Sequence, residues 1–87
     1  MNRRLFAFAA LACSLPLAAP ALADVKAGVD AWAAGDYEGA VKEWREPALA
    51  GDADAQFNLG QAYRLGRGVP ANLDIALDWF RKAAAPR

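Results

Sequence analysis

Histidine is absent from the 87 residues, and cysteine and methionine occur once each, as Cys13 and Met1. Without histidine the chain lacks the commonest general base and a common metal ligand. With no cysteine beyond residue 13, the rest of the chain has no thiol nucleophile and no disulfide. Carboxylates are plentiful, but their spacing brings no acid and base together. The sequence therefore predicts that the protein is not an enzyme and holds no metal and no cofactor.

An excess of charge is also missing, because ten Lys and Arg balance ten Asp and Glu. Nucleic-acid binding domains carry a basic patch or stripe, and no long basic run occurs here. We therefore expect no nucleic-acid partner. The one long apolar run, at residues 5–15, is shorter than the roughly 20 residues that a membrane helix needs.

Residues 1–23 have the pattern of an export signal. Arg3 and Arg4 precede the apolar run, and Ala21-Leu22-Ala23 supplies the small residues that a signal peptidase accepts. We expect cleavage after Ala23, which would leave a periplasmic or secreted bacterial protein without a stable membrane span.

A lipoprotein anchored at Cys13 is the alternative to cleavage after Ala23. Lipoprotein signals favour Leu three residues before the cysteine, and Ala10 stands there instead. Anchoring at Cys13 would also leave a very short hydrophobic segment, so we favour cleavage.

Two helices are predicted between residues 24 and 51. The first covers residues 25–34, follows the N-cap Asp24, and has Val25, Val29 and Trp32 on one side. The second follows Asp36, and Pro47 is expected to kink it or stop it early. Its apolar face has the spacing i, i+3, i+4, i+7 and i+11 and consists of Tyr37, Ala40, Val41, Trp44 and Ala48.

Two more helices are predicted after Asp52, which is expected to cap the third. The buried face of the third consists of Ala55, Leu59, Ala62 and Tyr63. The fourth follows Asn72 and ends before Pro86. Its face repeats the spacing of the second helix and consists of Leu73, Ala76, Leu77, Phe80 and Ala84.

The second and fourth helices are related by a constant offset of 36 residues. Tyr37 corresponds to Leu73 and Trp44 to Phe80 at this offset. A fixed period that preserves one apolar face is typical of stacked repeats. The loop before the fourth helix is longer by the five residues 67–71, so the first hairpin has the tighter turn.

The segment from 52 to 84 resembles a Sel1-like repeat, a relative of the tetratricopeptide repeat. The residues that carry this likeness are Ala55, Leu59, Gly60, Tyr63, Gly66, Gly68, Val69, Asn72, Ala76, Trp79, Ala83 and Ala84. Asn72 stands where Asp is commonest, and Ile75 where Lys is usual. The likeness implies a helical-repeat scaffold for protein contacts, without a catalytic residue.

The expected fold is all-α: antiparallel helix-turn-helix repeats stacked as a short right-handed α-solenoid of two units. Residues 1–23 would be the signal peptide, 24–51 a tetratricopeptide-like hairpin, and 52–87 the Sel1-like repeat. Such a small domain has little apolar area to bury. The exposed end of the last hairpin could therefore dock on a partner, self-associate, or continue into further repeats.

The expected function is protein–protein interaction, as an adaptor or scaffold in the cell envelope. By analogy with other solenoids, the first helix of each unit lines the concave binding surface. The candidate contact residues are Asn58, Gln61, Arg64 and Arg67. The alternative function is a structural or regulatory envelope factor that contacts peptidoglycan or assists complex assembly.

One motif-like stretch is better explained by structure. Residues 66–71 fit the form G-x-G-x-x-A, but a dinucleotide site needs a preceding strand, and here a helix precedes. We therefore expect Gly66 and Gly68 to adopt positive φ in a repeat loop.

Trp79 is expected to pack on the preceding unit, the alternative being an exposed patch with Ala83.

Overall fold

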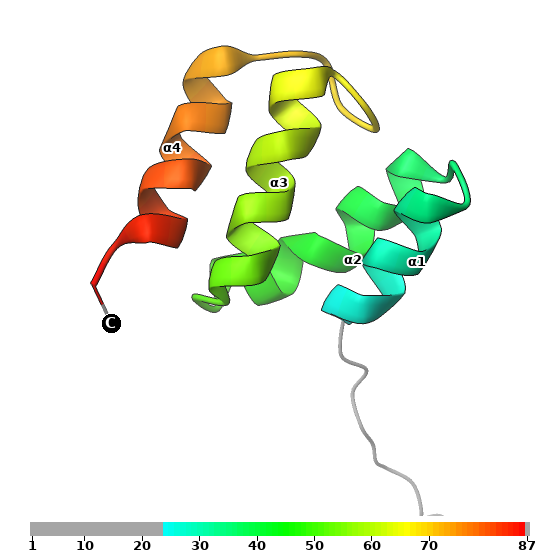
Figure 1. Ribbon diagram of the computed structural model, residues 1–87, viewed down its shortest axis with the longest axis horizontal. Helices are drawn as coiled ribbons and strands as arrows, with labels where there is room; N and C mark the ends of the chain where they lie inside the picture. Colours follow the sequence, from blue (N-terminus) through cyan, green and yellow to red (C-terminus); the bar gives the residue numbers. More distant parts are fainter. Residues whose placement is uncertain (1–23, 87) are drawn as a thin grey trace, which may run out of the picture.

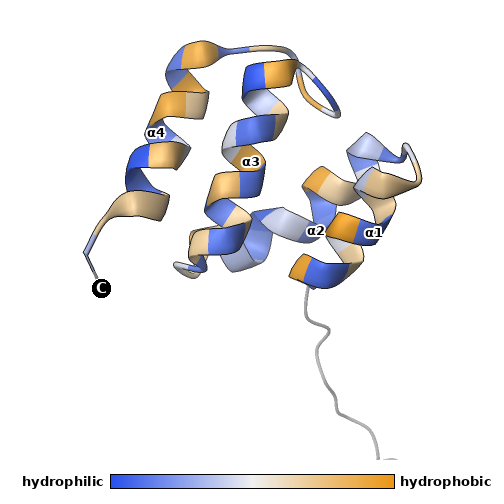
Figure 2. Ribbon diagram, viewed as in Figure 1, coloured by the Kyte–Doolittle hydropathy of each residue, from blue (hydrophilic) through white to orange (hydrophobic). Residues whose placement is uncertain are grey.

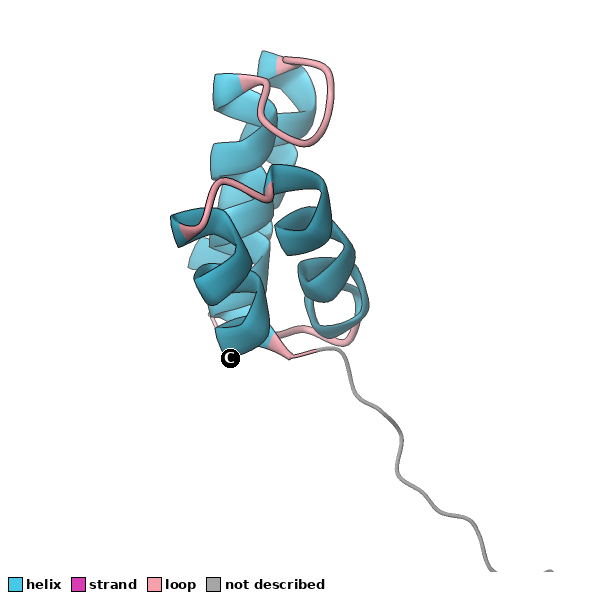
Figure 3. Ribbon diagram, turned by 90° about the vertical axis from the view of Figure 1, so that its right-hand side faces the viewer, coloured by secondary structure: helices cyan, strands magenta, loops and turns pink. Residues whose placement is uncertain are grey.

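The computed structural model describes residues 24–86, which fold into four α-helices and no strand. The helices are α1 (Val25–Ala33), α2 (Tyr37–Leu49), α3 (Ala53–Leu65) and α4 (Leu73–Ala84). Consecutive helices run in opposite directions, and the hairpin of α1 and α2 lies beside the hairpin of α3 and α4 (Figures 1 and 3). The extensive contacts join α1 to α2, α2 to α3, and α3 to α4. The expected export signal lies outside the described residues.

Each helix begins at the N-cap that the sequence predicts. The side-chain oxygens of Asp36, Asp52 and Asn72 accept hydrogen bonds from backbone N–H groups three residues later, at 2.9, 2.9 and 3.0 Å. Asp24 accepts one from Lys26 N at 3.0 Å. These bonds satisfy N–H groups that have no partner inside the helix. Local side-chain chemistry therefore fixes where all four helices start.

The core lies mainly between α2 and α3. The buried apolar residues Ala40, Val41, Trp44 and Ala48 of α2 face Ala55, Leu59 and Ala62 of α3. These seven belong to the faces that the sequence predicts for the second and third helices. Tyr37 and Tyr63, predicted on the same faces, are half-buried. Apolar and polar residues alternate around the ribbons accordingly (Figure 2).

The prediction for α1 is partly wrong. Val25 and Trp32 pack against the core as expected, but 47% of Val29 is exposed. The buried residue of α1 is Gly28, which allows α2 to approach closely. A Cβ at position 28 would lie 2.6 Å from Trp44 Cδ1. The face of α1 that packs on α2 is therefore the face that carries Gly28.

The prediction for α4 is also partly wrong. Ala76 is buried, but Leu73, Leu77 and Ala84 are exposed, and Phe80 is half-buried. The reason is that α3 is the only one of the described helices that packs extensively against α4. In α2 the corresponding residues are covered because α2 lies between α1 and α3. The exposed apolar residues of α4 remain unaccounted for by the fold.

Pro47 does not stop α2, which continues to Leu49. The proline occupies the last turn, and its carbonyl oxygen accepts a hydrogen bond from Asp52 N at 2.9 Å. Gly51 has a φ of 101° and reverses the chain into α3. Of the two predicted effects of Pro47, the early stop is therefore excluded and the kink stays a prediction, and the reversal comes at Gly51.

The junction between α2 and α3 is also held by a buried side chain that the sequence prediction missed. Gln56, 6% exposed, donates a hydrogen bond from Nε2 to the carbonyl oxygen of Ala48 at 3.0 Å. Buried polar groups are stabilising when hydrogen-bonded and costly when not. Gln56 thus ties the start of α3 to the end of α2.

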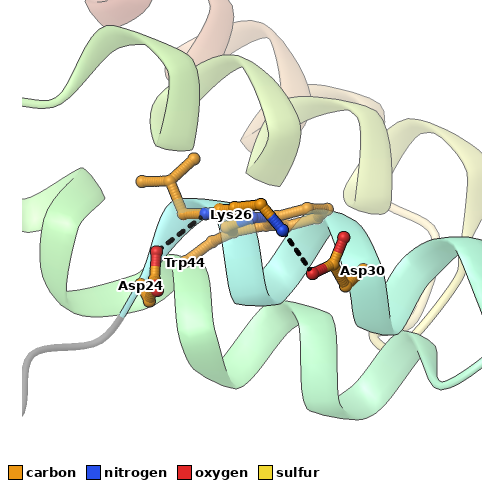
Figure 4. A network of polar contacts seen from close by, with 5 residues as sticks. Asp24, Lys26, Asp30 and Trp44 are labelled. Atoms are coloured by element: carbon orange, nitrogen blue, oxygen red, sulfur yellow. Dashed lines mark hydrogen bonds and ion pairs between the residues drawn. The ribbon is translucent and has the colours of Figure 1, made fainter.

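The start of α1 is tied to α2 by polar contacts. The backbone N of Asp24 donates a hydrogen bond to Glu43 Oε1 at 3.0 Å. Trp44 Nε1 donates to the carbonyl oxygen of Val25 at 3.1 Å. On the outer side of α1, Lys26 Nζ is 2.9 Å from Asp30 Oδ2 (Figure 4). The first turn of α1 is therefore anchored at two points.

Candidate functional site

A groove with a volume of about 210 Å³ lies between α1 and α3, and we call it the α1–α3 groove. Its lining mixes two aromatic, two aliphatic and two amide side chains: Trp32, Trp44, Val29, Leu65, Asn58 and Gln61. It thus joins the first helices of the two predicted units. Two of the four predicted contact residues, Asn58 and Gln61, belong to it.

Trp44 is the best-fixed residue in the lining. It is 3% exposed, its indole N–H is bonded to Val25, and its ring lies 5.5 Å from that of Trp32 between centroids. The close approach of Gly28 confines the ring further. The sequence prediction assigned Trp44 and Trp32 to the core alone and missed that both also line a groove. This wall is rigid and apolar.

Val29 and Leu65 supply exposed apolar surface in the lining, one from each helix. They are 47% and 42% exposed. Val29 had been expected inside, and Leu65 had no predicted role. Exposed apolar side chains are ordinary when scattered, but these two belong to one concavity with an aromatic wall. A partner's apolar side chain placed there would remove both from water.

The polar part of the lining comes from α3. Gln61 Oε1 accepts a hydrogen bond from Arg64 Nε at 2.9 Å. This bond positions the Arg64 guanidinium beside the amide that lines the groove. Arg64 therefore belongs with the groove although it does not line it, and it leaves further N–H donors for an acidic group.

Arg67 lies apart from the other three predicted contact residues. Its guanidinium carbon is 5.1 Å from the centroid of the Tyr37 ring, a cation–π distance. Tyr37 belongs to a second, more open cleft of about 550 Å³ between the α1–α2 turn and the α3–α4 loop. The structure therefore separates Arg67 from the α1–α3 groove. Its position was not predictable from spacing, because the loop folds back onto the first hairpin.

The charge pair on α1 stabilises the charged form of Lys26. The hydrogen bond to Asp30, together with the charge of that carboxylate, raises the pKa of Lys26 above its usual 10.5. Both side chains are largely exposed. Pairs four residues apart on an exposed helix face are worth little, so this one is a local feature of α1.

Among residues 24–86, no group of three or more Asp, Glu, His or Cys side chains is placed to hold a metal ion. None of the four described helices has the length and apolar character needed to cross a membrane.

Residues 53–85 match the sequence profile of the Sel1 repeat family. This segment is a Sel1 repeat. It contains all of α3 and α4 and the loop between them. Sel1 repeats generally mediate protein–protein interaction and are not catalytic. No curated protein and no solved structure matched the chain.

The signature residues of the Sel1 repeat have structural positions. Ala55, Leu59, Gly60 and Ala76 are buried. Gly60 allows α4 to approach α3, since a Cβ there would lie 2.6 Å from Phe80 Cδ1. These residues hold the two helices of the repeat together and leave the α1–α3 groove to other side chains.

The loop and the last helix supply the rest of the signature. Gly66 and Gly68 have φ of 69° and 78°, which confirms the predicted loop conformation. Val69 and Trp79 pack against the core as half-buried residues. Trp79 also has Lys82 Nζ 4.8 Å from its ring centroid. Trp79 is thus half-buried against the core, which contains residues of both α2 and α3, and its packing on the preceding unit stays a prediction.

Proposed function

We propose that this protein is an exported adaptor that holds a segment of a partner protein in the α1–α3 groove. The observation that carries the proposal is the composition of the groove: a rigid tryptophan wall, exposed Val29 and Leu65, and an arginine positioned by Gln61. Aromatic anchors and arginine are enriched where proteins bind each other.

The size of the groove favours a protein partner over a small molecule. Small-molecule sites usually have volumes of about 300–1,000 Å³, and the groove has about 210 Å³. That volume suits one large apolar side chain. We therefore propose a segment with an aromatic or aliphatic anchor and a neighbouring Asp or Glu that pairs with Arg64.

The proposal also covers the export of the protein and the stacking of its two helical units. Arg3 and Arg4, the apolar run and the small residues up to Ala23 support cleavage there and a place in the periplasm or outside the cell. The relation of α2 to α4 at 36 residues supports two stacked units, which we propose wind as a right-handed solenoid. Localisation by fractionation and N-terminal sequencing of the exported protein tests the first part.

The test of the groove is capture of partners from a periplasmic extract with three forms of the protein. Val29→Glu places a charge in the groove, and we expect it to weaken binding at least tenfold, since burial of an unpaired charge is costly. Leu49→Glu is the matched control, because Leu49 is an exposed aliphatic residue of α2 outside the groove.

A protein lost with Val29→Glu and kept with Leu49→Glu supports the proposal. Equal capture by both variants contradicts it. Sedimentation with purified peptidoglycan distinguishes the alternative function, because a glycan-binding factor would co-sediment without any protein partner.

A further inference from the structure

The strongest unexplained feature is the exposed apolar face of α4. Leu73 and Leu77 are 65% and 48% exposed, and Ala84 is exposed beside the half-buried Phe80. At the offset of 36 residues, Leu77 corresponds to Val41, which is only 2% exposed, and Ala84 to Ala48, which is buried. On α2 this face is covered by neighbours on both sides. Among residues 24–86, the matching face of α4 has no second neighbour.

The spacing along this face is that of a helix-pairing seam. Leu73, Leu77, Phe80 and Ala84 follow one another at four, three and four residues, which is the alternation of a and d positions in a coiled coil. Because consecutive helices along the chain are antiparallel, a helix that covers α4 as α3 covers α2 would also be antiparallel (Figure 1). The face therefore accepts an antiparallel helix.

The charges of α4 complement an antiparallel copy of α4 itself. Asp74 and Asp78 lie in its first half, and Arg81 and Lys82 in its last turn. Asp74 directly follows the seam residue Leu73, and Arg81 directly follows the seam residue Phe80. In an antiparallel pair of α4 helices, position 74 of one copy lies near position 81 of the other. Arg81 Nη1 is only loosely paired within its own helix, 3.9 Å from Asp78 Oδ1, and both side chains are largely exposed.

The side-chain sizes are complementary in the same register. Pairing residue 77 with residue 80 of the other chain places the large Leu73 opposite the small Ala84. Ala84 lines a shallow groove between α3 and α4, together with Phe57, Phe80 and Ala83. Phe57 is 50% exposed and its ring centroid is 5.4 Å from that of Phe80. A leucine from a second copy would extend this aromatic surface.

We propose that two copies of this chain form a symmetric dimer through antiparallel α4 helices, with Leu73 of each copy beside Ala84 of the other and Asp74 facing Arg81. The α1–α3 groove is lined by residues of α1, α2 and α3, none of which belongs to the proposed dimer seam. The dimer is thus independent of the adaptor role proposed above.

Sedimentation velocity of the exported protein at micromolar to 100 µM concentrations tests the dimer. We expect a dimer for the unsubstituted protein and a monomer for Leu77→Glu. Circular dichroism should give the same helix content for both, because Leu77 is already half-exposed in one chain. A monomer for the unsubstituted protein throughout this range overturns the proposal, as does a dimer that survives Leu77→Glu.

Charge reversal tests the register. Asp74→Arg alone and Arg81→Asp alone each replace two attractions with two repulsions, and we expect either to raise the dimer Kd about tenfold. The double variant Asp74→Arg/Arg81→Asp restores opposite charges across an antiparallel pair and should return the Kd close to its original value. Failure of the double variant to recover overturns the antiparallel pairing, and so does a heterologous partner or further repeat found on α4.

Discussion

Gly28 and Trp44 are in direct contact across the α1–α2 interface, with no room for a side chain at position 28. The second hairpin has the same arrangement, in which Gly60 of α3 meets Phe80 of α4. In each hairpin a glycine of the first helix receives an aromatic ring of the second, and the two rings are 36 residues apart. The two pairs set how closely the helices approach.

Gly28→Ala tests this contact by the sign of its effect. Alanine favours a helix by about 1 kcal/mol over glycine, so an open site would gain stability. Trp44 is buried and hydrogen-bonded to Val25, so it cannot move cheaply to admit a methyl group. We expect a net loss of about 1–3 kcal/mol in the free energy of unfolding, measured by urea denaturation. A gain in stability would contradict the close packing.

Gly68→Ala tests the fold-back of the α3–α4 loop, and Gly35→Ala is its control. Both glycines have positive φ, 78° and 86°. A Cβ at 68 would lie 2.5 Å from the carbonyl oxygen of Tyr37, whereas nothing lies within 4 Å at 35. We expect about 1 kcal/mol of destabilisation for Gly35→Ala from strain alone, and at least twice that for Gly68→Ala. Equal losses in thermal denaturation would rule out the contact with Tyr37.

Gln56→Leu removes the hydrogen bond to Ala48 while keeping most of the side-chain volume. We expect it to cost about 1–2 kcal/mol of folding free energy. Gln61→Leu is the control on the same helix, because Gln61 is more exposed and bonds only to the side chain of Arg64 among the interactions described. If both variants unfold at the same urea concentration, Gln56 does not tie the hairpins together.

The pair on α1 predicts a pH dependence at the alkaline end. The pKa of Lys26 is raised in the folded protein by Asp30, so its contribution to stability is complete below the usual pKa of 10.5 and is lost as the pH rises through the folded value. Titration by NMR of the Lys26 side chain should show this pKa falling toward 10.5 in Asp30→Asn. An unchanged pKa in that variant would mean that the pair does not form in solution.

The sequence predicts the local features of this fold well. The N-caps, the positive φ of Gly66 and Gly68 and the buried face of α2 depend on residues close in the chain, and all are found. Val29 and Leu77 were wrongly expected to be buried because periodicity identifies an apolar face but not what covers it. In α1 the face that packs on α2 is the one that carries Gly28. Beside α4 no further helix is present among the described residues to cover its apolar face.

The candidate site was less predictable for the same reason. Asn58 and Gln61 were identified by analogy with other solenoids, but the walls of the groove come from α1 and α2, far away in sequence. Arg67 was grouped with Arg64 because they are neighbours in the chain. The loop instead carries Arg67 onto Tyr37. Contacts across hairpins are not encoded in spacing.

The hydrogen bond from the backbone N of Asp24 to Glu43 changes in chemical character if signal peptidase cuts after Ala23. That peptide nitrogen would become a free terminal ammonium, placed 3.0 Å from a carboxylate oxygen. A hydrogen bond from an uncharged amide to a carboxylate would thereby become an ion pair between α1 and α2. Maturation would then do more than release the protein: the act of cutting would itself strengthen the newly freed end.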